Sequence, residues 1–291
     1  MSVTEITIGM PLYNNASTLN RAISSIRAQT YTHWKLVISD DGSTDETNSI
    51  LNNINDPRVE IFRQPKNLYF KNFNFVLKKA NTPYFSWLAG DDYWKSNFLE
   101  KTVQYLNKHQ KCTLISPKCS FEDEGGVFQN ISSGTYPIIG DKDERIAKYL
   151  KNPSDNSRMY GLFRTECLKK SMPNKIFHAW DWSLCARNLQ YGEHHELNEI
   201  LLYREKTLSQ NYVKSIERDE VSLLTRYFPV MRCSLDIIRS GVKPSRTVLV
   251  SLVYINIFKH WEYIKVKNTF LNRLLTPLYW RLLRLLNSLH Y

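Results

Sequence analysis

Two clusters of aspartate residues are the part of this chain best suited to chemistry. Residues 39–45 read SDDGSTD and residues 88–94 read LAGDDYW, and each cluster follows a short apolar stretch that predicts a strand. In an open α/β sheet, ligands bind beyond the carboxyl ends of the strands, and paired carboxylates there are suitable ligands for a divalent cation. Either cluster alone is also typical of a solvated turn. Together they predict one shared site for a metal ion and a nucleotide.

Alternating strands and helices must position these aspartates. Helices are predicted after Ser17 or Thr18, after Thr44 or Asp45, and over Asn72–Ala80. The predicted strands are Ile6–Met10, which Pro11 is expected to end, then Trp34–Ile38, Val59–Phe62, Tyr84–Leu88 and, further along, Met159–Arg164. Strands that alternate with helices form a mostly parallel sheet with helices on both faces, so we expect an α/β fold.

Length and composition limit what this site belongs to. The 291 residues suffice for one large or two modest domains, each with a hydrophobic core. The five cysteines include no C-x-x-C pair, so we expect reduced thiols and neither a disulfide framework nor a zinc site. No basic segment followed by an apolar stretch opens the chain, which favours a protein that works inside the cell.

The net charge of +11 is concentrated near the end of the chain. Residues 241–291 carry eight basic residues against one acidic residue. A localised basic segment favours contact with a particular anionic surface over general binding of polyanions, so we expect no nucleic-acid partner.

A leucine stripe in the same segment points to a membrane. On a helix, eight leucines fall along one side and three arginines fall together on the far side. They are Leu271, Leu274, Leu275, Leu278, Leu282, Leu285, Leu286 and Leu289, with Arg273, Arg281 and Arg284. The apolar stretch Thr247–Phe258 is shorter than the roughly twenty residues of a spanning helix. We therefore expect residues 247–291 to lie on an anionic membrane surface; the alternative is packing on the catalytic domain or on a second subunit, as in a homo-oligomer.

Four motifs in order carry a resemblance to a known family. They are residues 11–15 (PLYNN), residues 29–31 (QTY) before Trp34, residues 39–45 and residues 89–92 (AGDD). Over residues 4–210 the chain resembles a family 2 glycosyltransferase with the GT-A fold. The resemblance implies a sugar-nucleotide donor, a Mn²⁺ or Mg²⁺ ion, and transfer with inversion at the anomeric carbon. It implies a donor-binding half at residues 1–110 and an acceptor-binding half of the same GT-A domain at residues 111–212. Beyond the resemblance, residues 213–291 are expected to form a helical extension.

The resemblance also implies roles for individual residues. Asp92 is the expected metal ligand, because an ion that bridges two phosphates needs hard oxygen ligands from the protein. Asp91 would contact the ribose or the donor sugar, and Asp41 would accept a hydrogen bond from the base, which suggests uracil. Tyr13 would stack on that base. The same pocket would also include Pro11, Asn15 and Asp40, while Arg204 of the Tyr-Arg element would contact the diphosphate. Lys71 could also reach the diphosphate, but a lysine at a helix start is more often solvated.

Two positions depart from the family's pattern. Residues 67–74 resemble its Asn-x-Gly region, but Tyr69 stands where glycine is usual. Lys206 stands where the family often has histidine, and a charged lysine cannot ligate a metal.

Asp181 is the expected catalytic base. It lies between Trp180 and Trp182 at the start of a predicted helix, where the family carries its catalytic aspartate. Inversion requires a base that removes the proton of the attacking acceptor hydroxyl, and an apolar surround would raise the pKa of Asp181 and make it a better base. The tryptophans would also offer a platform for the acceptor sugar. The alternative is that Asp181 merely caps the helix.

These inferences favour an inverting, metal-dependent glycosyltransferase that extends a surface polysaccharide or glycolipid. It would transfer sugar from a UDP-sugar to a glycan or lipid-linked acceptor, as a peripheral protein on the cytoplasmic face of the membrane. Glycines and acidic residues near residues 120–140 suggest a mobile acceptor-side loop. One alternative is a non-catalytic nucleotide-sugar-binding scaffold at the membrane. A nucleotidyltransferase is disfavoured because no glycine-rich phosphate loop follows the first strand.

Overall fold

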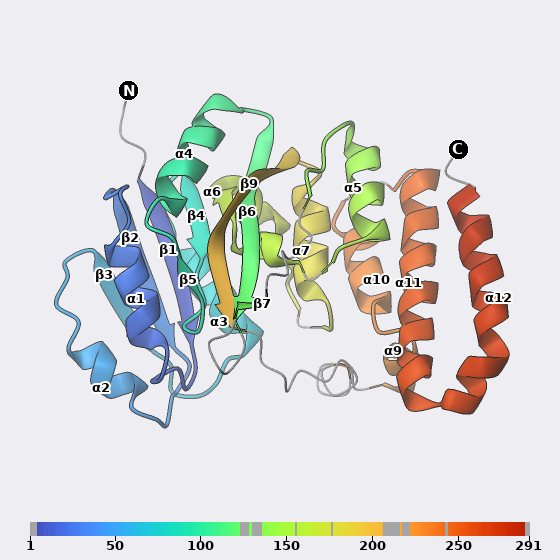
Figure 1. Ribbon diagram of the computed structural model, residues 1–291, viewed down its shortest axis with the longest axis horizontal. Helices are drawn as coiled ribbons and strands as arrows, with labels where there is room; N and C mark the ends of the chain where they lie inside the picture. The colour runs from blue at the N-terminus through green and yellow to red at the C-terminus, as the bar shows by residue number, and fades with distance from the viewer. Residues whose placement is uncertain are drawn as a thin grey trace. The chain divides into compact units, whose positions relative to one another are not determined.

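The computed structural model describes residues 5–122, 128–129, 136–154, 156–175, 177–205, 216, 222–241 and 244–288. The chain forms two compact units (Figure 1). The first comprises Met1–Pro137, Ser154–Met172 and Gly192–Thr207, and the second comprises Ile138–Pro153, Pro173–Tyr191 and Leu208–Tyr291. Most of the predicted acceptor-side loop, together with Lys206 and Leu289, lies outside the described residues. The predicted division into a donor-binding half at residues 1–110 and an acceptor-binding half at residues 111–212 concerns function, and it stays a prediction.

A nine-stranded sheet forms the centre of the described part of the first unit. In spatial order its strands are β3 (Val59–Arg63), β2 (Trp34–Asp40), β1 (Ile6–Leu12), β4 (Tyr84–Trp87), β8 (Leu162–Arg164), β6 (Cys112–Glu122), β9 (Glu193–Glu205) and β5 (Tyr93–Trp94), while β7 (Phe128–Gln129) pairs with β6. The first four strands are parallel, β8 runs antiparallel to its neighbours, and β6 pairs in parallel with β9. The predicted mostly parallel sheet is confirmed.

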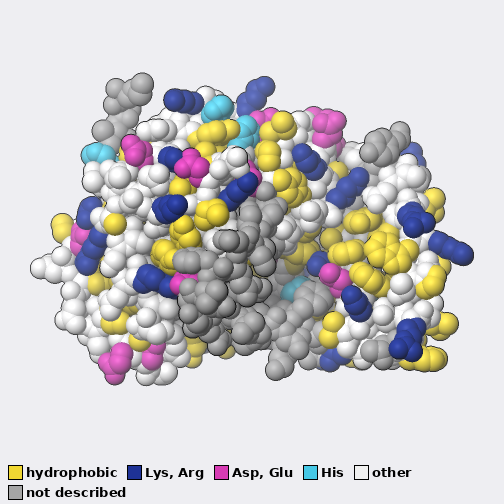
Figure 2. All heavy atoms as spheres, in the orientation of Figure 1, with side chains coloured by type: hydrophobic (Ala, Val, Ile, Leu, Met, Phe, Trp, Pro, Cys, Tyr) yellow, Lys and Arg dark blue, Asp and Glu magenta, His cyan; other side chains and the backbone are white. Residues whose placement is uncertain are grey.

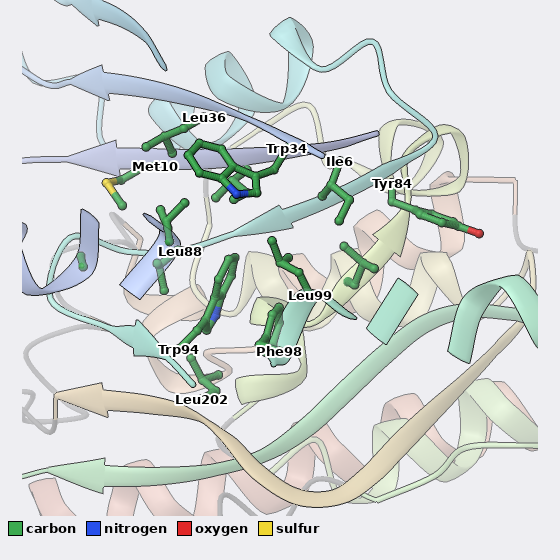
Figure 3. Close-up of a cluster of buried hydrophobic side chains, with 14 of the residues drawn as sticks. Ile6, Met10, Trp34, Leu36, Tyr84, Leu88, Trp94, Phe98, Leu99 and Leu202 are labelled. Atoms are coloured by element: carbon green, nitrogen blue, oxygen red, sulfur yellow. The ribbon is translucent and has the colours of Figure 1, made fainter. Parts of the chain in front are cut away.

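Helices cover the sheet because alternate strand residues face opposite sides. On one side, Ile6, Ile8 and Met10 of β1 belong to a buried core shared with the apolar stripes of two helices (Figure 3). On the other side, Gly9 leaves room for Val76, which would lie 2.8 Å from a Cβ at that position. The helices of this unit are α1 (Leu19–Arg27), α2 (Thr47–Asn52), α3 (Phe70–Lys79), α4 (Phe98–Lys108) and α6 (Thr165–Ser171), with a 3₁₀ turn η1 (Ser157–Tyr160).

Some predicted boundaries are wrong, and Pro11 is the most informative of them. Strand β1 does not end at Pro11 but continues to Leu12. The carbonyl of Gly9 accepts from Leu88 on the β4 side, and that of Leu12 accepts from Asp41 on the β2 side. Pro11 therefore faces the β4 side beyond the last paired residue of that strand, so its missing N–H removes no sheet hydrogen bond. The predicted strand Met159–Arg164 is likewise shorter, because Met159 belongs to η1.

The described residues of the second unit form helices. They are α5 (Lys142–Lys151), α7 (Trp180–Asn188), α9 (Leu223–Tyr227), α10 (Met231–Arg239), α11 (Arg246–Lys267) and α12 (Thr269–Ser288). Helix α11 packs on α5 and on α12, and α7 packs on α10. The predicted C-terminal helical region is confirmed. Among the described residues, no helix has both the length and the apolar character needed to cross a membrane.

The predicted leucine stripe of α12 is divided between two environments. Leu271, Leu275 and Leu286 are partly buried. Leu274, Leu278 and Leu285 are 66%, 59% and 57% exposed. The helix thus uses one side of the stripe for packing within the unit and leaves the other side accessible.

Candidate functional site

The two aspartate clusters leave the sheet at the same edge. Strands β1, β2 and β4 are parallel neighbours, with Leu12 opposite Asp40 and Gly9 opposite Trp87. Their carboxyl ends therefore bring together the loop that follows β1, residues 41–46 after β2, and residues 88–92 after β4. This arrangement confirms that the first unit has one edge carrying both clusters.

The backbone and the side chain of Asn14, in the loop after β1, form hydrogen bonds with the loop after β2. The N–H of Asn14 donates to Ser43 Oγ at 2.8 Å, and the N–H of Thr44 donates to Asn14 Oδ1 at 2.8 Å. Asn15 Oδ1 accepts from the N–H of Tyr13 at 3.0 Å. Asn15 thus uses its amide oxygen to close its own loop, while the ring of Tyr13 is 48% exposed and accessible to a planar ligand.

Asp40 closes the turn after β2. Its carboxylate is 1% exposed, accepts the backbone N–H of Ser43 at 3.2 Å, and makes a short hydrogen bond with Ser43 Oγ. Gly42 within this turn has φ +77°, a backbone region that favours glycine. In this structure Asp40 therefore stabilises the loop, and Pro11 lies beside it as a strand residue paired with Ser39.

Asp41 holds a second loop in an unusual conformation. Its Oδ1 accepts the N–H of Leu68 at 2.7 Å and its Oδ2 accepts the N–H of Tyr69 at 2.8 Å. Burial raises the pKa of Asp41, and these two backbone hydrogen bonds oppose that shift. Tyr69 has φ 52° and ψ −128°, a conformation that glycine adopts readily and tyrosine rarely. The position where the family usually has glycine is therefore one that requires positive φ, and here a tyrosine occupies it.

Asp92 and Arg204, 112 positions apart in the sequence, form an ion pair. Arg204 Nε lies 3.2 Å from Asp92 Oδ2, and the N–H of Glu205 donates to Asp92 Oδ1 at 3.2 Å. The guanidinium of Arg204 also donates to Ser157 Oγ at 3.1 Å and lies 4.3 Å from the centre of the Tyr160 ring. Burial raises the pKa of Asp92 to about 7, while the positive charge of Arg204 opposes the shift. The predicted metal ligand and the predicted diphosphate contact are thus brought together.

Helix α1 fixes the loop that carries Asp91 and Asp92. Thr18 Oγ1 donates to the carbonyl of Gly90 at 2.8 Å, and Arg21 Nη2 donates to the carbonyl of Asp91 at 3.0 Å. A Cβ at Gly90 would lie 2.4 Å from Leu12 Cδ2, so a larger residue at this position would have to displace the side chain of Leu12. The side chain of Asp91 is partly exposed, and that of Lys71 at the start of α3 is exposed.

The carboxylates at this edge suit a metal ion whose remaining ligands come from the phosphates of a bound sugar nucleotide. Within the described residues, no group of three histidine, cysteine, aspartate or glutamate side chains is arranged to hold a metal ion. Mg²⁺ in nucleotide sites is commonly bound through one or two carboxylates together with substrate phosphates. Asp92, with Asp91 beside it, supplies that share of the ligands, so the residues present fit such an ion.

Asp181 belongs to the second unit and is described there. It is the second residue of α7, whose N-cap residue is Ala179, so the alternative that Asp181 is the capping residue is wrong. Ala179 has φ 61°, a strained value for a residue with a Cβ. The Trp182 ring lies 5.1 Å from Lys259 Nζ, so this cation covers one face of a ring predicted to bind the acceptor sugar.

A further carboxylate, Asp236 of α10, lies beside α7 and was not found by sequence reasoning. Its Oδ2 accepts from Ser183 Oγ at 2.6 Å and from Arg187 Nη1 at 3.0 Å. The negative charges of Asp181 and Asp236 add to burial in raising the pKa of the Cys233 thiol. Asp236 has no motif around it in the sequence, and only the packing of α10 on α7 reveals it.

Solved structures of glycosyltransferases share this fold. Staphylococcus aureus TarS, residues 1–349 in complex with UDP-GlcNAc, matches with a TM-score of 0.58 at 15% identity, covering 89% of this chain and 81% of that chain. The mannosyltransferase PcManGT from Pyrobaculum calidifontis, in complex with GDP-Man and Mn²⁺, matches with a TM-score of 0.58 at 14% identity, covering 99% and 83%. The chain therefore has the fold of GT-A glycosyltransferases.

The sequence places the protein more narrowly within that class. Residues 7–172, more than half of the chain, match Glycosyl transferase family 2, and the protein belongs to this family of glycosyltransferases. The match includes both aspartate clusters and ends before Asp181 and Arg204.

Two curated relatives are named as glycosyltransferases. An uncharacterized glycosyltransferase of Rickettsia bellii is 32% identical over 126 residues, which are 42% of this chain and 18% of that protein. The Escherichia coli UDP-Glc:alpha-D-GlcNAc-diphosphoundecaprenol beta-1,3-glucosyltransferase WfgD is 33% identical over 108 residues, which are 36% of this chain and 42% of that protein. The chain thus spans less than half the length of either relative.

Proposed function

We propose that this protein is an inverting, metal-dependent transferase that moves a sugar from a UDP-sugar to a lipid-linked saccharide during surface polysaccharide synthesis. The observation that carries the proposal is the ion pair of buried Asp92 with partly exposed Arg204, at the edge of the sheet that also holds Asp41. A carboxylate and a guanidinium side by side suit a metal-bound diphosphate, because the carboxylate binds the cation and the guanidinium binds phosphate oxygens.

The donor would bind through the loops that Asp41 and Asn14 hold in place. Each carboxylate oxygen of Asp41 accepts one backbone N–H, which leaves acceptor capacity for the imide N–H of uracil. The exposed ring of Tyr13 would stack on the base. Uridine nucleotides are favoured because the WfgD name specifies UDP-Glc and the TarS structure holds UDP-GlcNAc.

Asp92 would ligate a Mn²⁺ or Mg²⁺ ion, and Asp91 would contact the ribose or the donor sugar. When bound, the ion would neutralise the negative charge that develops on the leaving diphosphate. Arg204 would bind an oxygen of the same diphosphate, and Lys71, exposed at the start of α3, would add a second cation. The use of Mn²⁺ is favoured by its presence in the PcManGT structure.

Asp181 would act as the general base. Its carboxylate would remove the proton of an acceptor hydroxyl as that oxygen attacks the anomeric carbon and the UDP leaves from the opposite face, which inverts the configuration. The strained φ of Ala179 fixes the start of α7 immediately before this residue, and such strain is typical of functional positions.

The accessible side of α12 would bind the membrane that holds the acceptor. Hydrophobic side chains gather over α11 and α12 on the face shown in Figure 2, with lysine and arginine side chains beside them. Phe270 and Leu274 are 75% and 66% exposed, and Arg281 on the same helix is also exposed. Apolar side chains flanked by arginine fit the headgroup region of an anionic bilayer, so the protein would work as a peripheral protein on the cytoplasmic membrane face.

Membrane binding is tested by sedimentation with vesicles. Wild-type protein should sediment with phosphatidylglycerol vesicles at low salt and should be released at high salt. The double variant Leu278→Glu/Leu285→Glu should remain in the supernatant. Ile139→Glu/Tyr191→Glu changes two exposed apolar residues of the second unit outside residues 247–291; it is the matched control and should sediment normally. Sedimentation of the double variant at the wild-type level would argue against α12 as the membrane surface.

The transfer reaction is tested by UDP release from UDP-Glc and UDP-GlcNAc with a synthetic diphospholipid-linked GlcNAc acceptor. Asp181→Asn should lower kcat by roughly 10²- to 10⁴-fold, the usual contribution of a general base, while UDP binds as tightly as to wild type. An unchanged kcat in Asp181→Asn would remove this residue from the reaction. A protein that binds UDP but transfers to no acceptor would favour the scaffold alternative.

A further inference from the structure

A cavity of about 520 Å³ lies within the second unit. Its described lining comes from the segment before α7 and from helices α9 and α10. This volume is in the usual range of small-molecule binding sites, which is roughly 300–1,000 Å³. None of the donor-site residues named above lines it.

Three cationic side chains belong to the described lining of this cavity. Lys175 precedes α7, and Arg232 and Arg239 lie seven residues apart on α10, which places both on one face of that helix. The side chains of Lys175 and Arg239 are exposed, so an anion can reach them from solvent.

The one carboxylate among the lining residues already has cationic and hydroxyl partners. Asp236 accepts from Arg187 Nη1 at 3.0 Å and from Ser183 Oγ at 2.6 Å. Arg187 compensates its charge, so the described lining holds three cationic side chains beside one carboxylate that already has a cationic partner. The cavity is therefore electrostatically suited to a multiply charged anion.

Apolar side chains line the same cavity, and helix α9, which contributes Thr225 to the lining, also carries two exposed leucines. Phe177 is 4% exposed in the lining, and Leu235 of α10 is 38% exposed. Thr225 of α9 lines the cavity, and its neighbours Leu223 and Leu224 are 72% and 59% exposed. A ligand with an anionic end and a hydrocarbon end matches this arrangement better than a purely ionic one.

We infer that this cavity binds the diphosphate and the first isoprenoid units of a polyprenyl-diphosphate-linked saccharide. The inference rests on the proposed function, which uses a lipid-linked saccharide as acceptor, and it identifies the class of lipid and where its diphosphate end binds. Lys175, Arg232 and Arg239 bind the phosphates, and Leu223 and Leu224 contact the chain. The lining residue Asp236 contacts Ser183, two residues after Asp181, so the cavity adjoins the helix that carries the proposed base.

Farnesyl diphosphate is a soluble probe of this site. We would measure its dissociation constant by calorimetry on the full chain, beside inorganic diphosphate and farnesol. Farnesyl diphosphate should bind at least about tenfold more tightly than either, because each of the other two lacks one half of the interaction. In Lys175→Gln/Arg239→Gln its affinity should fall at least about tenfold, since two charge-assisted contacts are lost. Lys108→Gln/Lys111→Gln removes two exposed lysines of the first unit and should leave binding unchanged.

The outcomes separate this inference from the proposed function. Equal affinities for farnesyl diphosphate and inorganic diphosphate would overturn the lipid assignment, and wild-type affinity in Lys175→Gln/Arg239→Gln would overturn the site. Asp92→Ala should retain farnesyl diphosphate binding while it loses UDP binding with Mn²⁺. UDP binding without farnesyl diphosphate binding would refute the cavity alone, and the reverse would refute the donor site alone.

Discussion

The backbone conformation of Tyr69 predicts which of two substitutions, by glycine or by alanine, leaves the protein more stable. At an ordinary position, replacing alanine by glycine costs about 0.5–1 kcal/mol, because glycine loses more conformational freedom on folding. A residue with a Cβ in a sparsely populated φ/ψ region costs of order 1–3 kcal/mol. At φ 52° and ψ −128° the second effect exceeds the first. Tyr69→Gly should therefore be more stable than Tyr69→Ala by about 0.5–2 kcal/mol.

The comparison with alanine separates strain from packing. Both variants remove the same tyrosine ring, which is 69% exposed and so contributes little burial. Both keep the backbone N–H groups of Leu68 and Tyr69 that Asp41 accepts. The difference between the variants therefore reports the cost of a Cβ in this conformation and not the loss of a ring contact.

The assay is the free energy of unfolding from urea titration, with the melting temperature as a second measure. The difference corresponds to about 1–4 °C if each kcal/mol shifts the melting temperature by about 2 °C, as in chains of this size. A Tyr69→Ala variant as stable as Tyr69→Gly, or more stable, would refute the assignment of a strained backbone at this position.

Three further predictions follow from the same edge of the sheet. The pKa of Asp92 is about 7, and a metal binds only the ionised carboxylate. The affinity for UDP with Mn²⁺ should therefore fall by up to about tenfold per pH unit below pH 7 and level off above it, and Arg204→Met should move the midpoint of this change to higher pH. An affinity that calorimetry finds unchanged between pH 6 and 8.5 would contradict this. Folding raises the pKa of Asp92 above its unfolded value near 3.9, so the folded state favours protonated Asp92. Without metal, the free energy of unfolding should therefore decline as the pH rises from 4 to 7, and this decline should be larger in wild type than in Asp92→Asn. Parallel pH profiles of the two proteins would argue against a raised pKa. Gly90→Ala should lower stability by about 1–3 kcal/mol in urea titration, because its Cβ would lie 2.4 Å from Leu12 Cδ2; a Gly90→Ala variant as stable as wild type would show that crowding at this position is unimportant.

The sheet and the aspartate clusters could be predicted because their signals are local. Apolar stretches such as Trp34–Ile38 and the turn residues after them determine strand ends within a few positions, and parallel strands bring those ends to one edge. The end of β1 was misjudged because the effect of Pro11 depends on whether the neighbouring strand still needs its N–H.

The contacts within the site could not be predicted, because they join distant parts of the chain. Nothing near Asp92 indicates that Arg204 will bind it, and the pKa of Asp92 depends on burial created by the whole sheet. The glycine-like backbone at Tyr69 likewise follows from the carboxylate of Asp41, which accepts from residues 68 and 69 across the loop. Asp236 contacts α7 only because two helices pack.

The most direct test of the proposed function is the melting temperature with UDP, in the presence and absence of Mn²⁺. UDP at about one hundred times its dissociation constant should add roughly 2.7 kcal/mol, which is several degrees for a chain of this size. We expect this rise in wild type only when Mn²⁺ is present, and no rise in Asp92→Ala. An equal rise without Mn²⁺, or a full rise in Asp92→Ala, would contradict a donor site built on Asp92 and a metal ion.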